Sequence, residues 1–119
     1  MENRKLFDSE FRLMELLWPA EPVTAKELAL SAADALGWNK NTTYTVLKKL
    51  VEKGVVERSE PGFLCMSLIK RQDVERAETE SLINKLFGGS KKAFFAAFLQ
   101  DDILSDEEIR ELREMIDNR

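Results

Sequence analysis

The stretch WNKNTTYTVLKKL, residues 38–50, decides the fold expected of this chain of 119 residues. Asn39 is a residue type that caps helix N-termini, and a glycine stands on either side of the segment at positions 37 and 54. At about 100° per residue, one arc of a helix collects Thr43, Val46, Leu47, Leu50 and Val51. The opposite arc is polar and collects Asn41, Thr42, Thr45, Lys48, Lys49 and Glu52, with Tyr44 at the boundary. The pattern predicts a helix over residues 39–53 with one buried and one exposed face.

Two further helices are predicted before this stretch. The first reads DSEFRLMELLW, with Asp8 as its N-cap and Pro19 as its end. The second begins after Thr24, with Glu27 in its first turn. The spacing of these two residues is that of a capping box, in which each side chain satisfies a backbone N–H of the other residue. It ends at Gly37, because glycine adopts the left-handed conformation that closes many helices.

A β-hairpin is predicted directly after the third helix. Residues 55–58 and 63–68 alternate or run apolar, and SEPG between them supplies a proline and a glycine for the turn. Three helices followed by a hairpin, in this order, are typical of a winged helix-turn-helix. The fold class is therefore mainly α with a small β-hairpin wing, and residues 1–72 are expected to form an N-terminal winged helix-turn-helix domain that binds DNA.

An acidic helical region follows the wing. Residues 73–119 carry a net charge of −5, against +1 for residues 1–72, and three helices are predicted there with Ser90 and Ser105 as N-caps. A unit this small, with no disulfide, buries too little surface to be stable alone. We therefore expect a three-helix C-terminal dimerisation domain over residues 73–119. Its interface is predicted to comprise Leu82, Leu86, Phe94, Phe95, Phe98, Leu99, Ile109, Leu112 and Ile116.

The composition argues against several classes of function. The chain has no histidine and a single cysteine, Cys65, so neither an internal disulfide nor a cysteine metal cluster is expected. No glycine-rich phosphate loop and no pair of nucleophile and base is apparent, so neither an enzyme nor a cofactor is predicted. The longest apolar run, AFFAAFL at residues 93–99, is too short to cross a bilayer, and the first residues do not resemble a signal peptide. We expect a cytoplasmic protein with no membrane insertion.

The polar face of the helix at residues 39–53 allows two interpretations. In the first, it is a recognition helix in the major groove of a double-stranded DNA operator, because lysines attract phosphates while amide and hydroxyl groups reach base edges. The predicted DNA contacts are then Lys40, Asn41, Thr42, Tyr44, Thr45, Lys48, Lys49 and, from the wing, Arg58. In the second interpretation the same face meets another protein, as in a winged-helix adaptor without DNA-binding activity. The order of helices and hairpin favours the first.

Three segments together resemble the BlaI/MecI-type penicillinase repressor family. They are FDSEFRLMELLW near the start, WNKNTTYTVLKKLVEKGVVER through the third helix into the wing, and LSDEEIRELREMI near the end. The resemblance covers nearly the whole chain and implies a homodimeric repressor that binds an inverted-repeat operator through its winged domain. It also implies that recognition-helix positions meeting DNA are occupied here by Asn41, Thr42, Tyr44, Thr45 and Lys49, with Tyr44 standing where the family often has arginine.

The resemblance also implies a candidate site of regulation. In the antibiotic-resistance branch of the family, a membrane sensor protease triggers cleavage inside the C-terminal domain. The matching bond is Ala97–Phe98, where alanine replaces the family's asparagine. In the copper-responsive branch a C-terminal cysteine cluster binds metal, and its absence from this sequence excludes copper sensing by that route. The expected partners are therefore operator DNA, a second copy of the chain and, acting indirectly, a membrane sensor protease.

Overall fold

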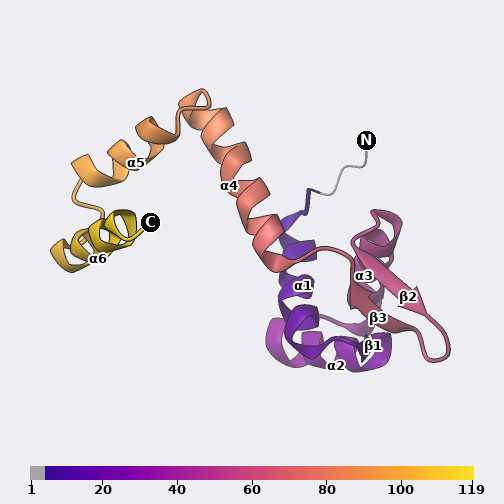
Figure 1. The fold of residues 1–119 in the computed structure, drawn as a ribbon. Helices are drawn as coiled ribbons and strands as arrows, with labels where there is room; N and C mark the ends of the chain where they lie inside the picture. Colours follow the sequence, from indigo (N-terminus) through magenta and orange to yellow (C-terminus); the bar gives the residue numbers. More distant parts are fainter. Residues whose placement is uncertain (1–4) are drawn as a thin grey trace. The chain divides into compact units, whose positions relative to one another are not determined.

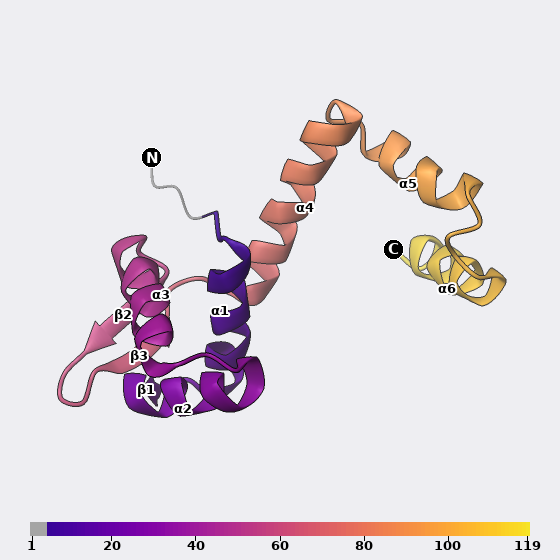
Figure 2. The ribbon, with the colours of Figure 1, turned by 180° about the vertical axis from the view of Figure 1, so that it is seen from behind.

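The computed structural model describes residues 5–119, which divide into two compact units, one reaching to Glu75 and the other spanning Arg76–Arg119 (Figures 1 and 2). The first unit contains α1 (Asp8–Ala20), β1 (Val23–Thr24), α2 (Ala25–Leu36), α3 (Lys40–Glu52), β2 (Val56–Ser59) and β3 (Leu64–Ser67). The helix α4 (Arg71–Phe87) begins in the first unit and continues into the second, which also holds α5 (Lys91–Gln100) and α6 (Asp106–Asp117). The predicted fold class, mainly α with a small hairpin wing, is confirmed.

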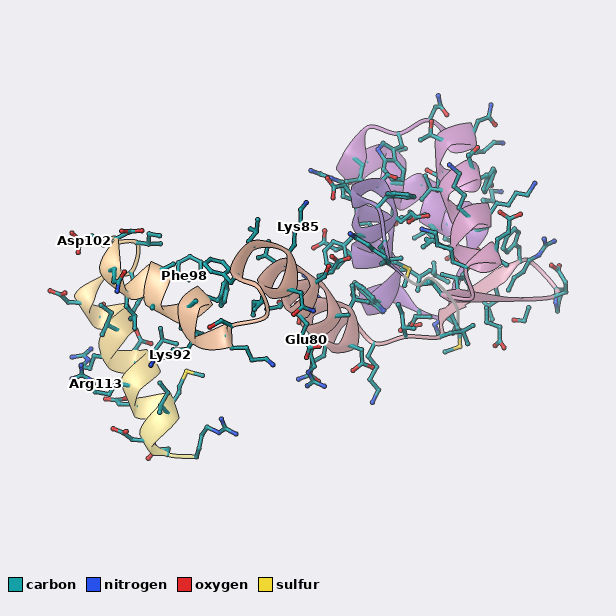
Figure 3. All side chains as sticks on the ribbon, turned by 90° about the horizontal axis from the view of Figure 1, so that it is seen from above. Glu80, Lys85, Lys92, Phe98, Asp102 and Arg113 are labelled. Carbon is teal, nitrogen blue, oxygen red and sulfur yellow. The ribbon has the colours of Figure 1, made fainter. Side chains whose placement is uncertain are left out.

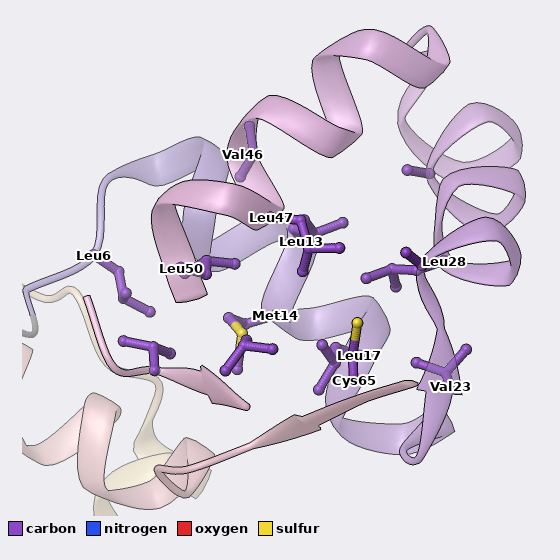
Figure 4. Close-up of a cluster of buried hydrophobic side chains, with 14 of the residues drawn as sticks. Leu6, Leu13, Met14, Leu17, Val23, Leu28, Val46, Leu47, Leu50 and Cys65 are labelled. Atoms are coloured by element: carbon purple, nitrogen blue, oxygen red, sulfur yellow. The ribbon is translucent and has the colours of Figure 1, made fainter. Parts of the chain in front are cut away.

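The core of the first unit is built around α1 (Figure 4). Its buried side chains come from all three helices and from the sheet, and the larger ones include Leu13, Met14, Leu17, Leu28, Leu47, Leu50, Val56 and Cys65. Burying such side chains is the main favourable term in folding. The arc of α3 predicted to face inward is buried at Thr43, Val46, Leu47 and Leu50 and half-buried at Val51. The opposite arc of α3 is consequently left facing solvent.

Side-chain caps begin α2, α3, α5 and α6, whereas the beginning of α1 differs from the prediction. Its N-cap is Phe7 rather than Asp8, and Phe7 has no side-chain cap to offer. Glu10 instead accepts a hydrogen bond from the backbone N–H of Phe7 at 2.8 Å through its Oε1. Asp8 is the first helical residue, where its negative charge favours the helix dipole. The capping box of α2 is confirmed, since Glu27 N donates to Thr24 Oγ1 at 3.1 Å and Thr24 N donates to Glu27 Oε1 at 3.2 Å. Hydrogen bonds from the Thr24 hydroxyl and then from its backbone N–H lower the pKa of Glu27.

The end of α1 also differs from the prediction. Pro19 lies in its last turn, and the helix continues to Ala20. A proline removes one N–H donor, but the next turn of hydrogen bonding survives, since Glu21 N donates to Leu17 O at 2.8 Å. The predicted end of α2 is confirmed, with Gly37 in the left-handed conformation at a φ of 70°.

The sheet is antiparallel, with strand order β1-β3-β2. The hairpin formed by β2 and β3 was predicted, whereas β1 was not. Val23 of β1 lies opposite Cys65 of β3, so the segment just before α2 joins the wing in one sheet. Glu21 strengthens this connection, because Ser67 donates to its carboxylate from the backbone N–H at 2.6 Å and from Oγ at 3.0 Å. The connection between α1 and α2 is therefore fastened to the wing.

The second unit contains α5 and α6, which begin at the predicted caps Ser90 and Ser105. Glu108 completes a capping box with Ser105, and hydrogen bonds from the backbone and then the side chain of Ser105 lower the pKa of Glu108. Neither α5 nor α6, both wholly within the described residues, has a buried side chain. Figure 3 shows the side chains of this unit, with Phe98 labelled on α5 and Arg113 on α6. Most of the apolar surface of this unit is thus uncovered.

Lys53, just beyond the end of α3, is held by α1. Its Nζ lies 2.6 Å from Glu10 Oε1, and the Glu10 side chain is only 1% exposed. The same ammonium donates to Lys5 O at 3.0 Å and lies 4.4 Å from the centroid of the Phe7 ring. Lys53 contributes to the positive charge of residues 38–53, yet its ammonium is used inside the protein. It anchors the C-terminal end of α3 to α1.

Replacing Lys53 with alanine should destabilise the first unit, because the buried Glu10 carboxylate would lose its cation. Breaking a buried ion pair from one side costs roughly 3–5 kcal/mol, and the partial exposure of Lys53, 21%, places the expected loss near the lower value. Lys48→Ala removes an exposed lysine from α3 itself and should cost less than about 0.5 kcal/mol. Urea unfolding of both variants at neutral pH measures the difference, and equal midpoints would show that the pair contributes nothing.

Candidate nucleic-acid interface

The outer face of α3 carries most of the side chains predicted to contact DNA. Asn39 positions the start of the helix, since Thr42 N donates to Asn39 Oδ1 at 2.8 Å. The exposed predicted residues of this helix are Lys40, Asn41, Thr42, Thr45, Lys48 and Lys49. Tyr44 is half-buried and packs against the core, so its position at the boundary of the face is as predicted.

The lysines of this face are available to bind anions. Within residues 5–119, none of Lys40, Lys48 and Lys49 forms an ion pair with a carboxylate, in contrast to Lys53. An ammonium without an internal partner can neutralise a phosphate without first giving up another contact. The outer face of α3 therefore combines three available cations with the amide of Asn41 and the hydroxyls of two threonines.

A hydrogen bond inside α3 limits what Thr45 can offer. Its Oγ1 donates to Asn41 O at 2.9 Å, so the hydroxyl hydrogen is used within the helix. Thr45 is left with oxygen lone pairs, which accept from amino groups on base edges, and with a methyl group that can meet the methyl of thymine. The side-chain amide of Asn41 offers both donors and an acceptor. The two residues are therefore suited to different base edges.

Arg58 of β2 is held within the wing. Its Nε donates to Glu60 Oε2 at 2.9 Å, and its guanidinium carbon lies 4.0 Å from the centroid of the Phe63 ring. Arg58 and Glu60 are both more than half exposed, so their ion pair contributes well under about 1 kcal/mol to stability. A phosphate reaching Arg58 would have to compete with Glu60. The wing and α3 are joined directly, since Val55 N donates to Leu50 O at 3.0 Å.

The remaining candidates for chemistry in the first unit belong to the core. Cys65 is fully buried, and burial raises the pKa of its thiol. Within residues 5–119, no group of three histidine, cysteine, aspartate or glutamate side chains is arranged to hold a metal ion. In the same part of the chain, no helix has both the length and the apolar content needed to cross a bilayer.

The residues predicted to form an interface lie in the second unit and are largely uncovered. Those classed as exposed are Leu82, Leu86, Phe95, Leu99, Leu112 and Ile116, and those half-buried are Phe94, Phe98 and Ile109. Phe94 stands at the centre of an aromatic cluster, with edge-on contacts to Phe87, Phe95 and Phe98 at centroid distances of 5.6, 5.3 and 5.1 Å. The cluster gives the first turns of α5 a defined arrangement.

An apolar groove of about 670 Å³ lies between α5 and α6. Its walls are formed by Phe94, Phe95, Phe98, Leu99, Leu104, Leu112, Met115, Ile116 and Arg119. Leu104, Met115 and Arg119 were not predicted from the sequence. Met115 could have been found, because it follows Leu112 by three residues and therefore lies on the same side of α6. The groove brings six of the nine predicted interface residues together, and Leu82, Leu86 and Ile109 do not line it.

The Ala97–Phe98 bond lies within α5, and both residues are half-buried. Proteases cut most readily in exposed, irregular segments. A cut at this bond therefore requires local opening of α5, which costs free energy in proportion to the contacts that are lost.

A sequence model of the family described as Penicillinase repressor matches residues 6–118. The chain belongs to this family. The penicillinase repressor of Bacillus licheniformis is 25% identical over 115 residues, covering 95% of this chain and 90% of that protein. The penicillinase repressor of Staphylococcus aureus is 27% identical over 112 residues, covering 92% and 89%. The methicillin resistance regulatory protein MecI of Staphylococcus aureus is 24% identical over 123 residues, covering the whole of both chains.

The penicillinase repressor family consists of repressors, not enzymes, as the sequence predicted. Among solved structures, the fold is similar to that of a Bacillus licheniformis protein, BlaI, determined in solution in its monomeric form in complex with the blaP half-operator. The TM-score is 0.53 at 22% identity, covering 61% of this chain and 93% of that one. The likeness supports the winged-helix fold.

Proposed function

We propose that this chain is a homodimeric transcriptional repressor of the cytoplasm, which binds a double-stranded DNA operator through α3 and the wing. The observation that carries the proposal is the outer face of α3, where three lysines have no carboxylate partner among residues 5–119 and lie beside an exposed asparagine and threonines. The penicillinase repressor family and the operator complex of the BlaI relative support DNA as the partner of this face.

The side chains of the outer face divide into two chemical roles. Lys40, Lys48 and Lys49 supply charge to phosphates, which contributes affinity that does not depend on base sequence. Asn41 and Thr45 are suited to base edges in the major groove, which is wide enough to admit an α-helix. The remaining predicted contacts, Thr42, Tyr44 and Arg58, would bind at the margins of this surface.

The groove between α5 and α6 supports dimerisation by the second unit. An exposed apolar groove as large as this one, on a small unit, indicates a surface that is covered by another protein. A second copy fits this role because the same groove on each chain allows a symmetric, self-complementary interface. Two winged units joined in this way would read an inverted repeat, and binding of the second half-site would benefit from its linkage to the first.

Cleavage at Ala97–Phe98 would act on dimerisation under this proposal. The bond separates Phe98, Leu99 and α6 from the rest of α5, so a cut would divide the walls of the groove. The outer face of α3 would remain intact on each fragmented chain. Loss of the linked second half-site would then release the operator.

The DNA contacts are tested by titrating the protein against DNA from upstream of its own gene at two salt concentrations. Lys49→Ala should weaken binding to operator and random DNA alike and lower the salt dependence by roughly one charge per subunit. Asn41→Ala and Thr45→Val should instead cost about 1–3 kcal/mol on the operator and little on random DNA. Lys85→Ala, an exposed lysine of the second unit, is the control and should behave as wild type.

Two outcomes of that titration would contradict the proposal. Indifference of binding to all three α3 substitutions would remove α3 from the DNA surface. The absence of any salt-sensitive DNA binding by the wild type would favour the adaptor, in which the same face meets a protein.

Glu60→Gln should strengthen DNA binding through the wing, because Arg58 would no longer be neutralised by its neighbour. We expect affinity for any DNA sequence to rise severalfold, with a steeper salt dependence by about one charge per subunit. Glu57→Gln removes an exposed carboxylate from β2, the strand that carries Arg58, without affecting the Arg58–Glu60 pair. Comparison of the two variants separates the local effect from the change in net charge. Equal affinities for the two variants would show that Glu60 does not restrain Arg58.

Ile116→Glu should dissociate the dimer. Ile116 lines the groove and is 69% exposed in the single chain, so the dimer would have to bury the unpaired charge of the glutamate. Leu30→Glu changes a residue of similar exposure, 66%, on α2 and should leave the dimer intact. Truncation after Glu75 keeps the buried Val74 in the first unit and should yield a folded monomer. Sedimentation velocity measures all three, and a dimer of unchanged stability in the Ile116→Glu variant would place the interface elsewhere.

A further inference from the structure

Arg71, the first residue of α4, contacts three side chains of α1 and one of its own helix. Its Nη2 lies 3.2 Å from Glu15 Oε2, and its Nε lies 3.2 Å from Glu75 Oε2. Its guanidinium carbon lies 5.5 Å from the centroid of the Phe11 ring and 5.9 Å from that of Trp18. We call these five residues the Arg71 cluster. All of them belong to the first unit.

Neighbouring contacts attach the same turn of α4 to the first unit. Trp18 Nε1 donates to Ile69 O at 3.1 Å, just before α4 begins. The rings of Phe11 and Trp18 meet edge-on with centroids 5.9 Å apart, so they form one aromatic surface. Val74, one turn into α4, is 7% exposed and belongs to the core built around α1. The first turn of α4 is therefore part of the winged unit rather than a free linker.

The Arg71 cluster is better suited to orientation than to stability. The side chains of Arg71, Glu15 and Glu75 are 47%, 41% and 54% exposed, and ion pairs this exposed contribute little to folding. Guanidinium groups are nevertheless planar and donate in fixed directions. The Glu15 carboxylate and the aromatic surface of α1 therefore define one arrangement of Arg71, and Glu75 holds the guanidinium from its own helix. The first turn of α4, where these contacts are made, is the point at which the helix Arg71–Phe87 joins the first unit.

We propose that Arg71 is a positioning residue for operator recognition, which narrows the range of half-site spacings that the dimer accepts. The inference rests on the proposed function, in which the first unit reads a half-site and the second binds another copy. The half-sites of helix-turn-helix dimers lie about one helical turn of DNA apart, or a multiple of it. Freedom at the first turn of α4 would let the two winged units reach other spacings, at the expense of the preferred one.

The expected effect follows from the linkage between the two half-sites. Once one winged unit is bound, the other reaches its half-site at an effective concentration set by the connection between them. A restricted connection concentrates the second unit near one spacing, and a loosened one spreads it over several. Arg71 should therefore affect binding to paired half-sites but not binding to a single half-site.

The experiment uses the full chain and a set of DNA fragments. One fragment carries a single half-site, and the others carry inverted half-sites whose spacing changes by one base pair at a time. Arg71→Ala should lose about five- to twentyfold in affinity at the preferred spacing, lose less at neighbouring spacings and bind the single half-site as wild type does. The affinity of Arg71→Lys at the preferred spacing should lie between those of the wild type and Arg71→Ala, because an ammonium keeps the charge but not the planar geometry of the guanidinium. Arg76→Ala, five residues further along α4 and exposed, is the matched control and should keep the wild-type profile.

The outcomes separate this inference from the proposed function. A wild-type spacing profile for Arg71→Ala would overturn the inference and leave the repressor proposal standing. Weaker binding by Arg71→Ala to the single half-site, with a lower melting temperature, would make Arg71 a structural residue and would also overturn it. If the wild type bound none of the fragments in a salt-sensitive way, the proposed function and the inference would both be refuted. Sedimentation of Arg71→Ala as a dimer completes the expected result.

Discussion

The packing of α3 against α1 is the contact on which the rest of the first unit depends. Leu47 and Leu50 share a fully buried core with Leu13 and Leu17, and this fixes which side of α3 faces inward. When the apolar arc of a helix is buried in a core, its opposite arc faces solvent, and the polar arc of α3 is exposed for this reason. Thr43 of the same arc is also buried, and its hydroxyl has no hydrogen-bond partner within the described residues.

The distribution of charge in the first unit follows from the same packing. Lys53 is drawn inward because α1 places the buried Glu10 carboxylate beside it, and Arg58 is paired with Glu60 within the wing. Among the described residues, Lys40, Lys48 and Lys49 of α3 form no ion pair and are left for phosphates. A chain with a net charge of −4 can still present a local positive surface, because screening limits exposed charges to a range of about 8–10 Å in physiological salt.

Much of the fold could be predicted from the sequence because its signals act over three or four residues. Thr24 with Glu27, Asn39, Ser90 and Ser105 begin their helices through bonds to backbone groups within the next turn. Helical periodicity likewise separated the two faces of α3, and apolar side chains on a small acidic unit indicated an uncovered surface. For the candidate site, the sequence by itself determined which residues of α3 are exposed, since that depends only on the period of the helix and on which arc is apolar.

Only the tertiary structure decided which distant residues meet. The two-residue strand β1 is too short to show a period, and it exists because β3, about forty residues later, offers it partners. Asp8 has the chemistry of an N-cap, yet Glu10 caps the backbone N–H of Phe7 and binds Lys53 across 43 residues. Arg71 meets Glu15 across 56 residues in the same way. Local chemistry cannot specify such pairs, because they form only after the packing of helices has brought the side chains within reach.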